Sequence, residues 1–240
     1  MRRIKDIIFN TPKEKIITVF CIFVAVAAII ISTILFASAY NGKTEEPLPS
    51  EVPTYSDELL KPTYHAESPK SLEYQSIGGG MCVVSGIGGF SGDELEIPEK
   101  SPEGEAVIGI AAGAFEGCDE LISVYIPSSI ATIGDSAFKG CSSLVVINVE
   151  SSNSKFSSVG GVLFTKNKTQ LICYPASRVG SSYLLNPNVK VISVNAFYGA
   201  KNLVKINYEG SPAEFQEIEI GDGNKAFSDL PITCNYTPSK

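Results

Sequence analysis

The residue types that support catalysis or metal binding are few in this sequence, and their spacing matches no reactive motif. The only histidine, His65, lies in a proline-rich stretch, which argues against most histidine-based catalysis and most zinc sites. The six cysteines include no Cys-x-x-Cys pair, so neither a redox motif nor a zinc knuckle is indicated. The glycines at 78–80 and 86–89 lack the spacing of a phosphate-binding loop. We therefore predict that the chain is not an enzyme and holds no cofactor or metal.

Two of the cysteines, Cys118 and Cys141, occupy equivalent places in neighbouring copies of a sequence repeat. In a stack of such copies, adjacent strands lie about 4.8 Å apart, which permits a disulfide between them. The alternative is that each thiol is a small apolar plug in the interior. Ala200, in the same place of a third copy, favours the plug, because alanine fills space but cannot form a bridge. We expect buried free thiols, although the sequence does not decide whether the pair is bridged.

The elements that must position these residues are copies of a short repeat. Residues 110–121 align with residues 133–144, which begin 23 positions later, and a third copy lies at 192–203. Each copy contains an Ala-Phe pair and is followed by a short β-prone run. Self-similarity at a fixed period of about 20–29 residues is typical of a stacked solenoid. The sequence thus predicts a β-rich solenoid with about 23 residues per rung.

The β-prone runs divide their residues between a core and a surface. Residues two apart on a strand share a face. The pairs that we expect in the core are Val124 and Ile126, Ile147 and Val149, and Ile206 and Tyr208. The interleaved positions are predicted to face solvent, and they form the candidate protein-binding strand face: Ser123, Tyr125, Val146, Asn148, Lys205 and Asn207. Tyr125 is the strongest candidate, since tyrosine offers amphipathic contact area at low entropic cost.

One rung is longer than the others. Phe138 and Phe197 lie 59 residues apart, which is not a multiple of 23. Two β-prone runs around a short polar turn at Asn167 and Lys168 predict a hairpin insertion near residues 160–175. The Ala-Phe phenylalanines, Phe115, Phe138 and Phe197, are expected in or near a common internal column, where ring pairs in contact gain about 0.5–1.5 kcal/mol beyond burial.

The N-terminal part of the chain predicts a membrane segment followed by a tether. Residues 16–36 carry no charge and, as a helix, are long enough to cross a hydrocarbon core of about 30 Å. Residues 1–15 have a net charge of +3, which favours a cytoplasmic location. We predict a basic tail at 1–15, a transmembrane helix or signal peptide at 16–38, a disordered proline-rich acidic linker at 41–72 and a repeat domain at 73–240.

The residues that follow the apolar segment leave two fates open. Ala37, Ser38 and Ala39 fit the small-x-small pattern of a signal-peptide cleavage site. A single-pass anchor with an exported C-terminal domain is the first prediction, and secretion after cleavage near Ala39 is the alternative. Because the chain has a net charge of −7 and the basic tail contributes +3, the rest carries −10. An acidic exterior repels phosphate backbones, so we predict no nucleic-acid partner.

The repeat resembles the BspA-type, or Treponema pallidum-type, leucine-rich repeat family. The residues that match the family pattern most closely are Ile133, Gly134, Ala137, Phe138, Cys141, Leu144, Ile147 and Val149. A second copy matches at Ala114, Phe115, Cys118, Leu121, Val124, Ile126 and Pro127. The resemblance covers residues 72–236 and departs from the pattern at Ala200, where the family has cysteine. It implies a right-handed leucine-rich repeat solenoid of a bacterial surface or secreted protein, often linked to adhesion, without a catalytic site.

Two kinds of function fit these observations. The first is a membrane-anchored protein-binding or adhesion module at the cell surface, whose partner is a host or envelope protein. The curved strand surface of a solenoid suits such contacts. The alternative is a structural or envelope-spacing protein without a dedicated ligand, which the small number of rungs favours.

Overall fold

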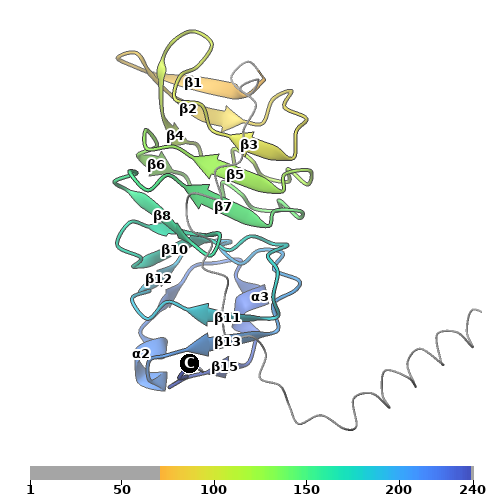
Figure 1. Cartoon of the computed structure of the whole chain (residues 1–240), viewed down its shortest axis with the longest axis vertical. Coiled ribbons are helices and arrows are strands. Elements are labelled where there is room, and N and C mark those ends of the chain that lie inside the picture. The colour runs from red at the N-terminus through yellow and green to blue at the C-terminus, as the bar shows by residue number, and fades with distance from the viewer. Residues whose placement is uncertain (1–70, 239–240) are drawn as a thin grey trace, which may run out of the picture. The chain divides into compact units, whose positions relative to one another are not determined.

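The structure, a computed structural model, describes residues 71–238, and this part of the chain is a β-solenoid of about seven turns. Figure 1 shows its short strands stacked rung upon rung. The strands before the predicted insertion are β1 (Glu73–Gly78), β2 (Met81–Gly86), β3 (Glu94–Glu96), β4 (Ala106–Ile110), β5 (Ser123–Ile126), β6 (Thr132–Ile133) and β7 (Val146–Val149). They form two sheets, in the orders β1-β2-β4-β6 and β3-β5-β7.

The predicted period is confirmed in these rungs. β4 and β6 pair in parallel with Ile110 opposite Ile133, and β5 and β7 pair in parallel with Ser123 opposite Val146. Both pairs join residues 23 positions apart. Each strand therefore hydrogen-bonds to its equivalent in the next rung, as a stacked repeat requires.

The long rung contains three antiparallel strands: β8 (Phe156–Val159), β9 (Val162–Thr165) and β10 (Gln170–Cys173). β9 and β10 enclose the predicted polar turn, whereas β8 was not foreseen. Beyond them the chain resumes its parallel rungs. The remaining elements are β11 (Ser182–Leu185), β12 (Val191–Ile192), β13 (Lys205–Tyr208), α2 (Pro212–Gln216), β14 (Glu219–Ile220), α3 (Lys225–Ser228) and β15 (Ile232–Thr233). Their sheets have the orders β14-β12-β10-β9-β8 and β11-β13-β15.

The turn before each Ala-Phe pair needs a left-handed residue. Gly113 fills this place in one rung with φ +64°, and Ser136 and Asn195 fill it in two others with φ +58° and +57°. Glycine adopts this conformation without a steric cost, and Asn visits it more readily than most residues. The repeat therefore keeps its turn while changing the side chain, and this change places two polar groups where the rungs meet.

The hydrophobic interior is divided into two clusters by β9. Leu163 belongs to the cluster that contains Phe115, Val124 and Ile147, whereas its neighbours Val162 and Phe164 belong to the cluster of the C-terminal rungs. All three β9 side chains are fully buried. Since successive side chains on a strand point to opposite faces, β9 acts as a partition with one core on each side.

The expected core positions are largely confirmed, but the common column of phenylalanines is not. Phe115 and Phe138 stack with ring centroids 5.5 Å apart, as predicted. Phe197 instead stacks on Tyr174 at 4.9 Å and contacts Phe227 at 4.7 Å. The reason is the partition, which lies between the cluster of Phe138 and that of Phe197.

The packed core includes the first residues that the structure describes. Leu72 is buried in the first cluster, and β1 begins at Glu73. The predicted membrane segment at 16–38 and most of the predicted linker lie outside the described residues. Between residues 71 and 238, no helix is both long and apolar enough to cross a membrane.

Candidate functional site

Four of the six predicted face residues lie side by side on β5 and β7. In the parallel ladder Ser123 pairs with Val146, and Tyr125 pairs with Asn148. The alternate residues of these strands, such as Val124, point into the core and are fully buried. The structure therefore places the four residues in one array on the outer side of this sheet.

β3 continues this array with two carboxylates. Glu94 pairs with Ser123, and Glu96 pairs with Tyr125. Burial, and to a smaller extent repulsion from Glu99, raises the pKa of the Glu96 carboxyl. The array is thus acidic at its β3 end and amphipathic over β5 and β7. We define the β3–β5–β7 face as Glu94, Glu96, Tyr125, Val146 and Asn148.

The other two predicted residues belong to a different sheet. Lys205 and Asn207 lie on β13, where they pair with Ser182 and Leu184 of β11. The sheet of β11, β13 and β15 shares no strand with the sheet of β3, β5 and β7. The six residues therefore do not form one continuous surface, because the inserted hairpin interrupts the register between β7 and β11.

Two of the predicted solvent-facing residues are in fact buried. Ser123 and Asn207 each expose only 7% of their surface. Among the described residues, neither the Ser123 Oγ nor the Asn207 Oδ1 has a hydrogen-bond partner. Both side chains are short or compact and sit between side chains from neighbouring strands about 4.8 Å away, which cover them. Tyr125, Val146, Asn148 and Lys205 remain half-buried, so they keep accessible area.

The turn between β8 and β9 closes one side of the β3–β5–β7 face. The Ile147 amide donates a hydrogen bond to the Gly161 carbonyl at 3.0 Å. A Cβ atom on Gly161 would lie 2.9 Å from the Val146 Cγ2, and Gly161 has φ +80°. Only glycine satisfies both the left-handed backbone and this close approach. The face therefore ends where the β8–β9 turn packs against β7.

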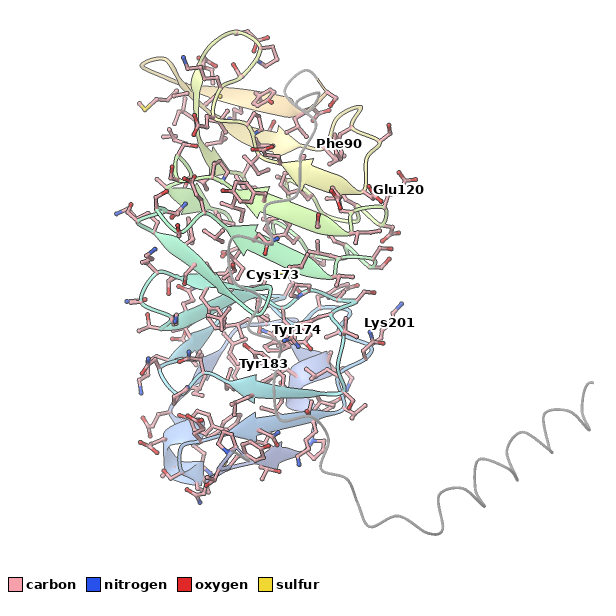
Figure 2. The ribbon with its side chains drawn as sticks, in the orientation of Figure 1. Phe90, Glu120, Cys173, Tyr174, Tyr183 and Lys201 are labelled. Carbon is pink, nitrogen blue, oxygen red and sulfur yellow. The ribbon has the colours of Figure 1, made fainter. Side chains whose placement is uncertain are left out.

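Arg178 connects the β8–β9 turn with two aromatic side chains. Arg178 donates from Nε to the Gly160 carbonyl at 3.0 Å. Its guanidinium lies 5.6 Å from the ring centroid of Tyr174 and 5.5 Å from that of Tyr183. Figure 2 shows Cys173, Tyr174 and Tyr183 one below another through the middle of the stack. Arg178 thus stabilises the junction between the two groups of rungs by contacts with ring faces.

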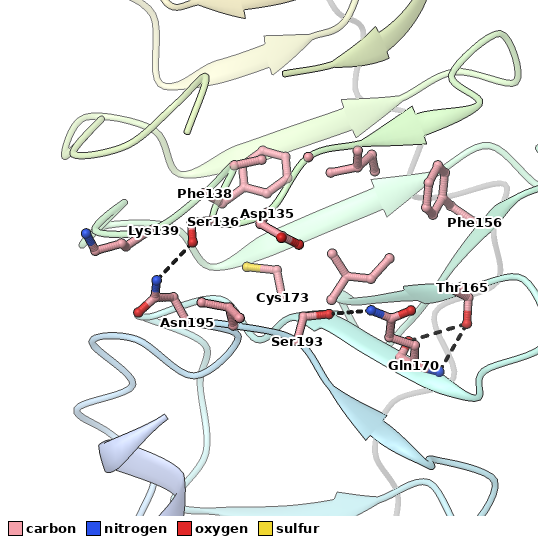
Figure 3. Close-up of a pocket in the computed structure, with 15 residues that line it drawn as sticks. Asp135, Ser136, Phe138, Lys139, Phe156, Thr165, Gln170, Cys173, Ser193 and Asn195 are labelled. Carbon is pink, nitrogen blue, oxygen red and sulfur yellow. Dashed lines mark hydrogen bonds between the residues drawn. The ribbon is translucent and has the colours of Figure 1, made fainter. Parts of the chain in front are cut away.

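A small cavity of about 110 Å³ lies at the same junction (Figure 3). Phe138, Phe156 and Cys173 line its apolar part. Across it, Asn195 Nδ2 donates to Ser136 Oγ at 2.9 Å, which links turns that are 59 residues apart. The hydrogen bond joins the two non-glycine residues that adopt the left-handed conformation in the turn before an Ala-Phe pair.

The cavity contains no constellation for catalysis or metal binding. Burial raises the pKa of the Cys173 thiol, so this sulfur is protonated at neutral pH and is a poor nucleophile. Gln170 Nε2 donates to Ser193 Oγ at 2.9 Å, which uses two of the polar groups in the wall. Between residues 71 and 238 no group of three His, Cys, Asp or Glu side chains could hold a metal ion.

The cysteines of the described part form no disulfide. Cys82, Cys118, Cys141, Cys173 and Cys234 are all free. Cys141 is buried and donates from Sγ to the Phe115 carbonyl at 3.0 Å, whereas Cys118 is half-buried. The interior-plug interpretation therefore describes Cys141 well and Cys118 only in part.

Sequence reasoning missed the partition and the cavity. The available signal was the spacing of 59 residues, which exceeds two periods by 13 and shows that extra chain must be placed somewhere. It does not reveal that β9 runs through the interior, because the sequence of a strand buried on both faces is not distinct from that of an ordinary apolar strand. The complete burial of Val162, Leu163 and Phe164 is the structural observation that identifies it.

Comparisons with known proteins agree with this architecture. The family model for the BspA type leucine rich repeat region matches residues 108–229 in six copies. A search of curated proteins gives no match. Similar solved structures include a leucine-rich repeat protein from Eubacterium ventriosum, with 29% identity, a TM-score of 0.47, and coverage of 55% of this chain and 32% of that chain.

Two further structures show the same kind of likeness. A leucine rich cell surface protein from Faecalibacterium prausnitzii is 23% identical with a TM-score of 0.42, and the match covers 59% of this chain and 41% of that one. A leucine rich repeat protein from T. pallidum is 20% identical with a TM-score of 0.39, and the match covers 68% and 82% of the two chains. The chain thus spans less than half the length of the first two structures.

Proposed function

Since this chain belongs to the BspA-type leucine-rich repeat family, we propose that it is an exported, non-enzymatic repeat protein that binds another protein through its β3–β5–β7 face. Leucine-rich repeat domains generally mediate protein–protein interaction. The fold thus supports protein binding in general, and the β3–β5–β7 face is our proposal for the surface that binds.

The observation that carries the proposal is the regular array on three paired strands. Tyr125 and Asn148 are neighbours across the β5–β7 ladder and are both partly accessible. Tyrosine and asparagine combine rigid contact area with adaptable hydrogen bonding, which suits a protein partner. The strands below this array are held by a fully buried core, so the face is rigid and binding costs little ordering entropy.

The charge of the face narrows the partner's chemistry. Glu94 and Glu96 border the array at β3, and no basic side chain belongs to the face. A partner with a basic rim around an apolar or polar centre would be steered toward it. We propose that this partner is a host or envelope protein.

The proposed location rests on the N-terminal sequence. Residues 16–38 have the length and apolarity of a membrane anchor, and the basic residues 1–15 favour a cytoplasmic N-terminus. We propose that the repeat domain is held outside the membrane by this segment. Release after cleavage near Ala39 is the other outcome, and N-terminal sequencing of the mature protein separates the two.

The test of the face uses the full chain in detergent or on cells. Once a partner has been isolated, the double variant Tyr125→Ala and Asn148→Ala is expected to weaken its binding at least tenfold, with an unchanged melting temperature. The matched control is Lys205→Ala on β13, which is expected to bind as wild type does. Unchanged affinity of the double variant, or an equal loss in the control, would reject this face as the binding surface.

A further inference from the structure

The charge of the chain is separated into blocks that its net charge conceals. Residues 73–150 contain twelve acidic and two basic side chains, and residues 209–238 contain six acidic and one basic. Between them, residues 151–208 contain seven lysines and arginines and no acidic residue at all. The inserted hairpin and the rung after it are therefore a basic block between two acidic ends.

The sheet topology lines up four lysines of this block. Lys155 lies just before β8, Lys166 just after β9, Lys168 two residues before β10 and Lys190 just before β12. β8 is antiparallel to β9, β9 is antiparallel to β10, and β10 is parallel to β12. These four chain positions consequently lie at the same end of four successive strands.

Backbone hydrogen bonds confirm that the four positions are neighbours. The Lys166 amide donates to the Lys155 carbonyl at 2.7 Å, and the Lys190 amide donates to the Thr169 carbonyl at 2.8 Å, one residue after Lys168. Neighbouring strands are spaced by about 4.8 Å, so the row extends over about 14 Å. The spacing of about 4.8 Å between neighbouring strands is shorter than the Debye length in physiological salt, about 8 Å, so the positive potentials of adjacent lysines add. We call Lys155, Lys166, Lys168 and Lys190 the lysine row.

The lysines of the row are available for a ligand. Lys155, Lys166 and Lys190 are exposed and Lys168 is half-buried. Within residues 71–238, none of the four forms an ion pair, and Lys166 Nζ donates to the Ser151 carbonyl at 2.9 Å. Acidic residues border the row: Glu150 precedes the block in the sequence, and the Glu219 amide donates to the Lys190 carbonyl. Hydrogen bonds from Ser211 and, to a smaller extent, the charge of Lys190 lower the pKa of the Glu214 carboxyl, which therefore lies near the Lys190 end. The row is thus a positive line with negative borders.

The composition of the row selects among anionic ligands. The exposed residues beside the lysines are Ser154, Asn167 and Asn188, and the single aromatic residue of these segments, Phe156, is buried. Without exposed aromatic side chains there is no platform for stacking nucleobases, and without exposed apolar side chains there is no anchor for a protein interface. A flat anionic membrane would also meet the acidic borders, whereas a narrow chain would follow the row.

Phosphate is an anion that lysine side chains commonly bind. Lysine is a common phosphate ligand that acts as a point charge, whereas arginine recognises planar carboxylates and phosphates with a bidentate fork. The row contains four lysines and no arginine. Lysines carried on strands about 5 Å apart along a line suit closely spaced phosphates on a flexible chain.

We propose that the lysine row is a binding site for a linear phosphate polymer, which lies across the ends of β8, β9, β10 and β12. The site is separate from the β3–β5–β7 face and does not depend on the proposed protein partner. Binding is electrostatic and therefore falls steeply with salt concentration.

The experiment measures binding of labelled inorganic polyphosphate to the full chain by fluorescence anisotropy over a series of salt concentrations. The test variant is Lys155→Gln, Lys166→Gln and Lys168→Gln. The control is Lys100→Gln, Lys201→Gln and Lys225→Gln, which removes the same charge from exposed lysines outside the row. We expect the test variant to bind at least tenfold more weakly and to have a smaller salt slope, by about 0.7 for each lost contact, and the control to bind within about twofold of wild type.

The competing ligands and a folding control complete the design. Melting curves of both variants are expected to match wild type, since the substituted side chains are at the surface. Poly-glutamate, single-stranded DNA and phosphatidylserine vesicles are expected to bind more weakly than polyphosphate at the same salt concentration. The proposal is overturned if polyphosphate does not bind at low salt, if both variants lose affinity equally, or if one of the other polyanions binds more tightly. The double variant Tyr125→Ala and Asn148→Ala is expected to retain polyphosphate binding, which keeps this test independent of the protein-binding face.

Discussion

The rungs before and after the inserted hairpin are built from the same repeat but fill their interiors differently. Before it, β4 and β6 pair at an interval of 23 residues, as do β5 and β7, whereas β2 and β4 pair at 25–26 and β3 and β5 at 29. The core of these rungs is mostly aliphatic, with one ring pair between Phe115 and Phe138. After it, β11 and β13 again pair at an interval of 23 residues, whereas Ile206 pairs with Ile232, 26 positions later, and Val191 with Glu219, 28 positions later. The interval varies in both groups of rungs, so the difference between them lies in the interior, where aromatic rings contact one another mainly after the hairpin. We infer that the repeat determines how the strands stack, whereas the side chains of each rung determine how its interior volume is filled.

The largest expected effect contrasts one phenylalanine from each group of rungs. Phe197 is fully buried and contacts the rings of Tyr174, Tyr183 and Phe227, so Phe197→Ala is expected to lower the free energy of unfolding by about 4–5 kcal/mol. Phe138 stacks on a single ring and already borders a cavity, so Phe138→Ala is expected to cost about 3 kcal/mol. Urea unfolding followed by circular dichroism measures both.

The order of these two losses is the informative result. If Phe138→Ala proved as costly as Phe197→Ala or more so, the aromatic rungs would not be the more tightly filled part. A melting curve of Phe138→Ala that coincides with wild type would also contradict its placement in the core.

A second contrast concerns two buried asparagines whose side chains form hydrogen bonds with backbone groups. Asn153 Nδ2 donates to the carbonyls of Pro127 and Ile130, and its Oδ1 accepts from the Lys155 and Phe156 amides. Removing the amide leaves these buried groups unsatisfied, so Asn153→Ala is expected to cost about 3 kcal/mol. The exposed Asn188→Ala is the control, with an expected change below about 0.5 kcal/mol.

Asn224 is the counterpart in the C-terminal rungs. Its side chain donates to the carbonyls of Ser193 and Gly221 and accepts from the Phe197 amide. We expect Asn224→Ala to cost about as much as Asn153→Ala, but to raise amide exchange near β12 and β13 instead of near β6 and β7. Equal exchange changes throughout the solenoid after either substitution would disprove the local effect.

A third expectation concerns the pH dependence of stability, to which Cys141 of the N-terminal cluster contributes. Burial raises the pKa of the Cys141 thiol from 9.0 to about 12. Between these two values the unfolded chain releases a proton that the folded chain retains, so stability falls as pH rises above 9. The loss attributable to Cys141 is expected to be about 1 kcal/mol between pH 8 and pH 10.

Urea midpoints at the two pH values, compared between wild type and Cys141→Ala, measure this contribution. The variant is expected to lose less stability over the same interval. A variant whose midpoint falls as steeply as that of wild type would show that Cys141 does not titrate in this way.

The smallest expected effect tests the hydrogen bond that joins the two groups of rungs. Asn195→Gly removes the bond from Asn195 Nδ2 to Ser136 Oγ and preserves the left-handed turn, because glycine accepts φ +57°. The expected cost is about 0.5–1.5 kcal/mol, the usual net value of one hydrogen bond. Asn195→Ala, which also strains the turn, is expected to cost more. The reverse order would contradict a cost of the left-handed turn for a residue with a Cβ atom, since both variants lose the hydrogen bond.

The sequence predicts the parts of this protein that repeat. The period, the strands that follow each Ala-Phe pair, and core residues such as Val124, Ile147 and Ile206 could all be predicted, because spacing and alternation determine them. Exposure of individual face residues could not. Ser123 and Asn207 alternate correctly with core residues, but their burial depends on the size of side chains on neighbouring strands.

The inserted hairpin marks the other limit of the sequence analysis. The excess length before Phe197 predicts that chain is added, and the β9–β10 turn is visible as Asn167 and Lys168. Nothing in the local pattern indicates that β9 is buried on both faces or that the Phe138 and Phe197 clusters are separated. That result arises from long-range packing, since Gly161 must reach β7 while Leu171 pairs with Phe164.

The central claim is that β9 separates two hydrophobic cores, each of which can open locally without the other. The most direct measurement is native-state hydrogen exchange of the full chain in wild type, Leu163→Ala and Phe164→Ala. Leu163 faces the N-terminal cluster and Phe164 the C-terminal cluster. The account predicts faster exchange in β4, β5 and β7 for Leu163→Ala, and in β12 and β13 for Phe164→Ala. Equal acceleration throughout the solenoid in both variants would contradict it.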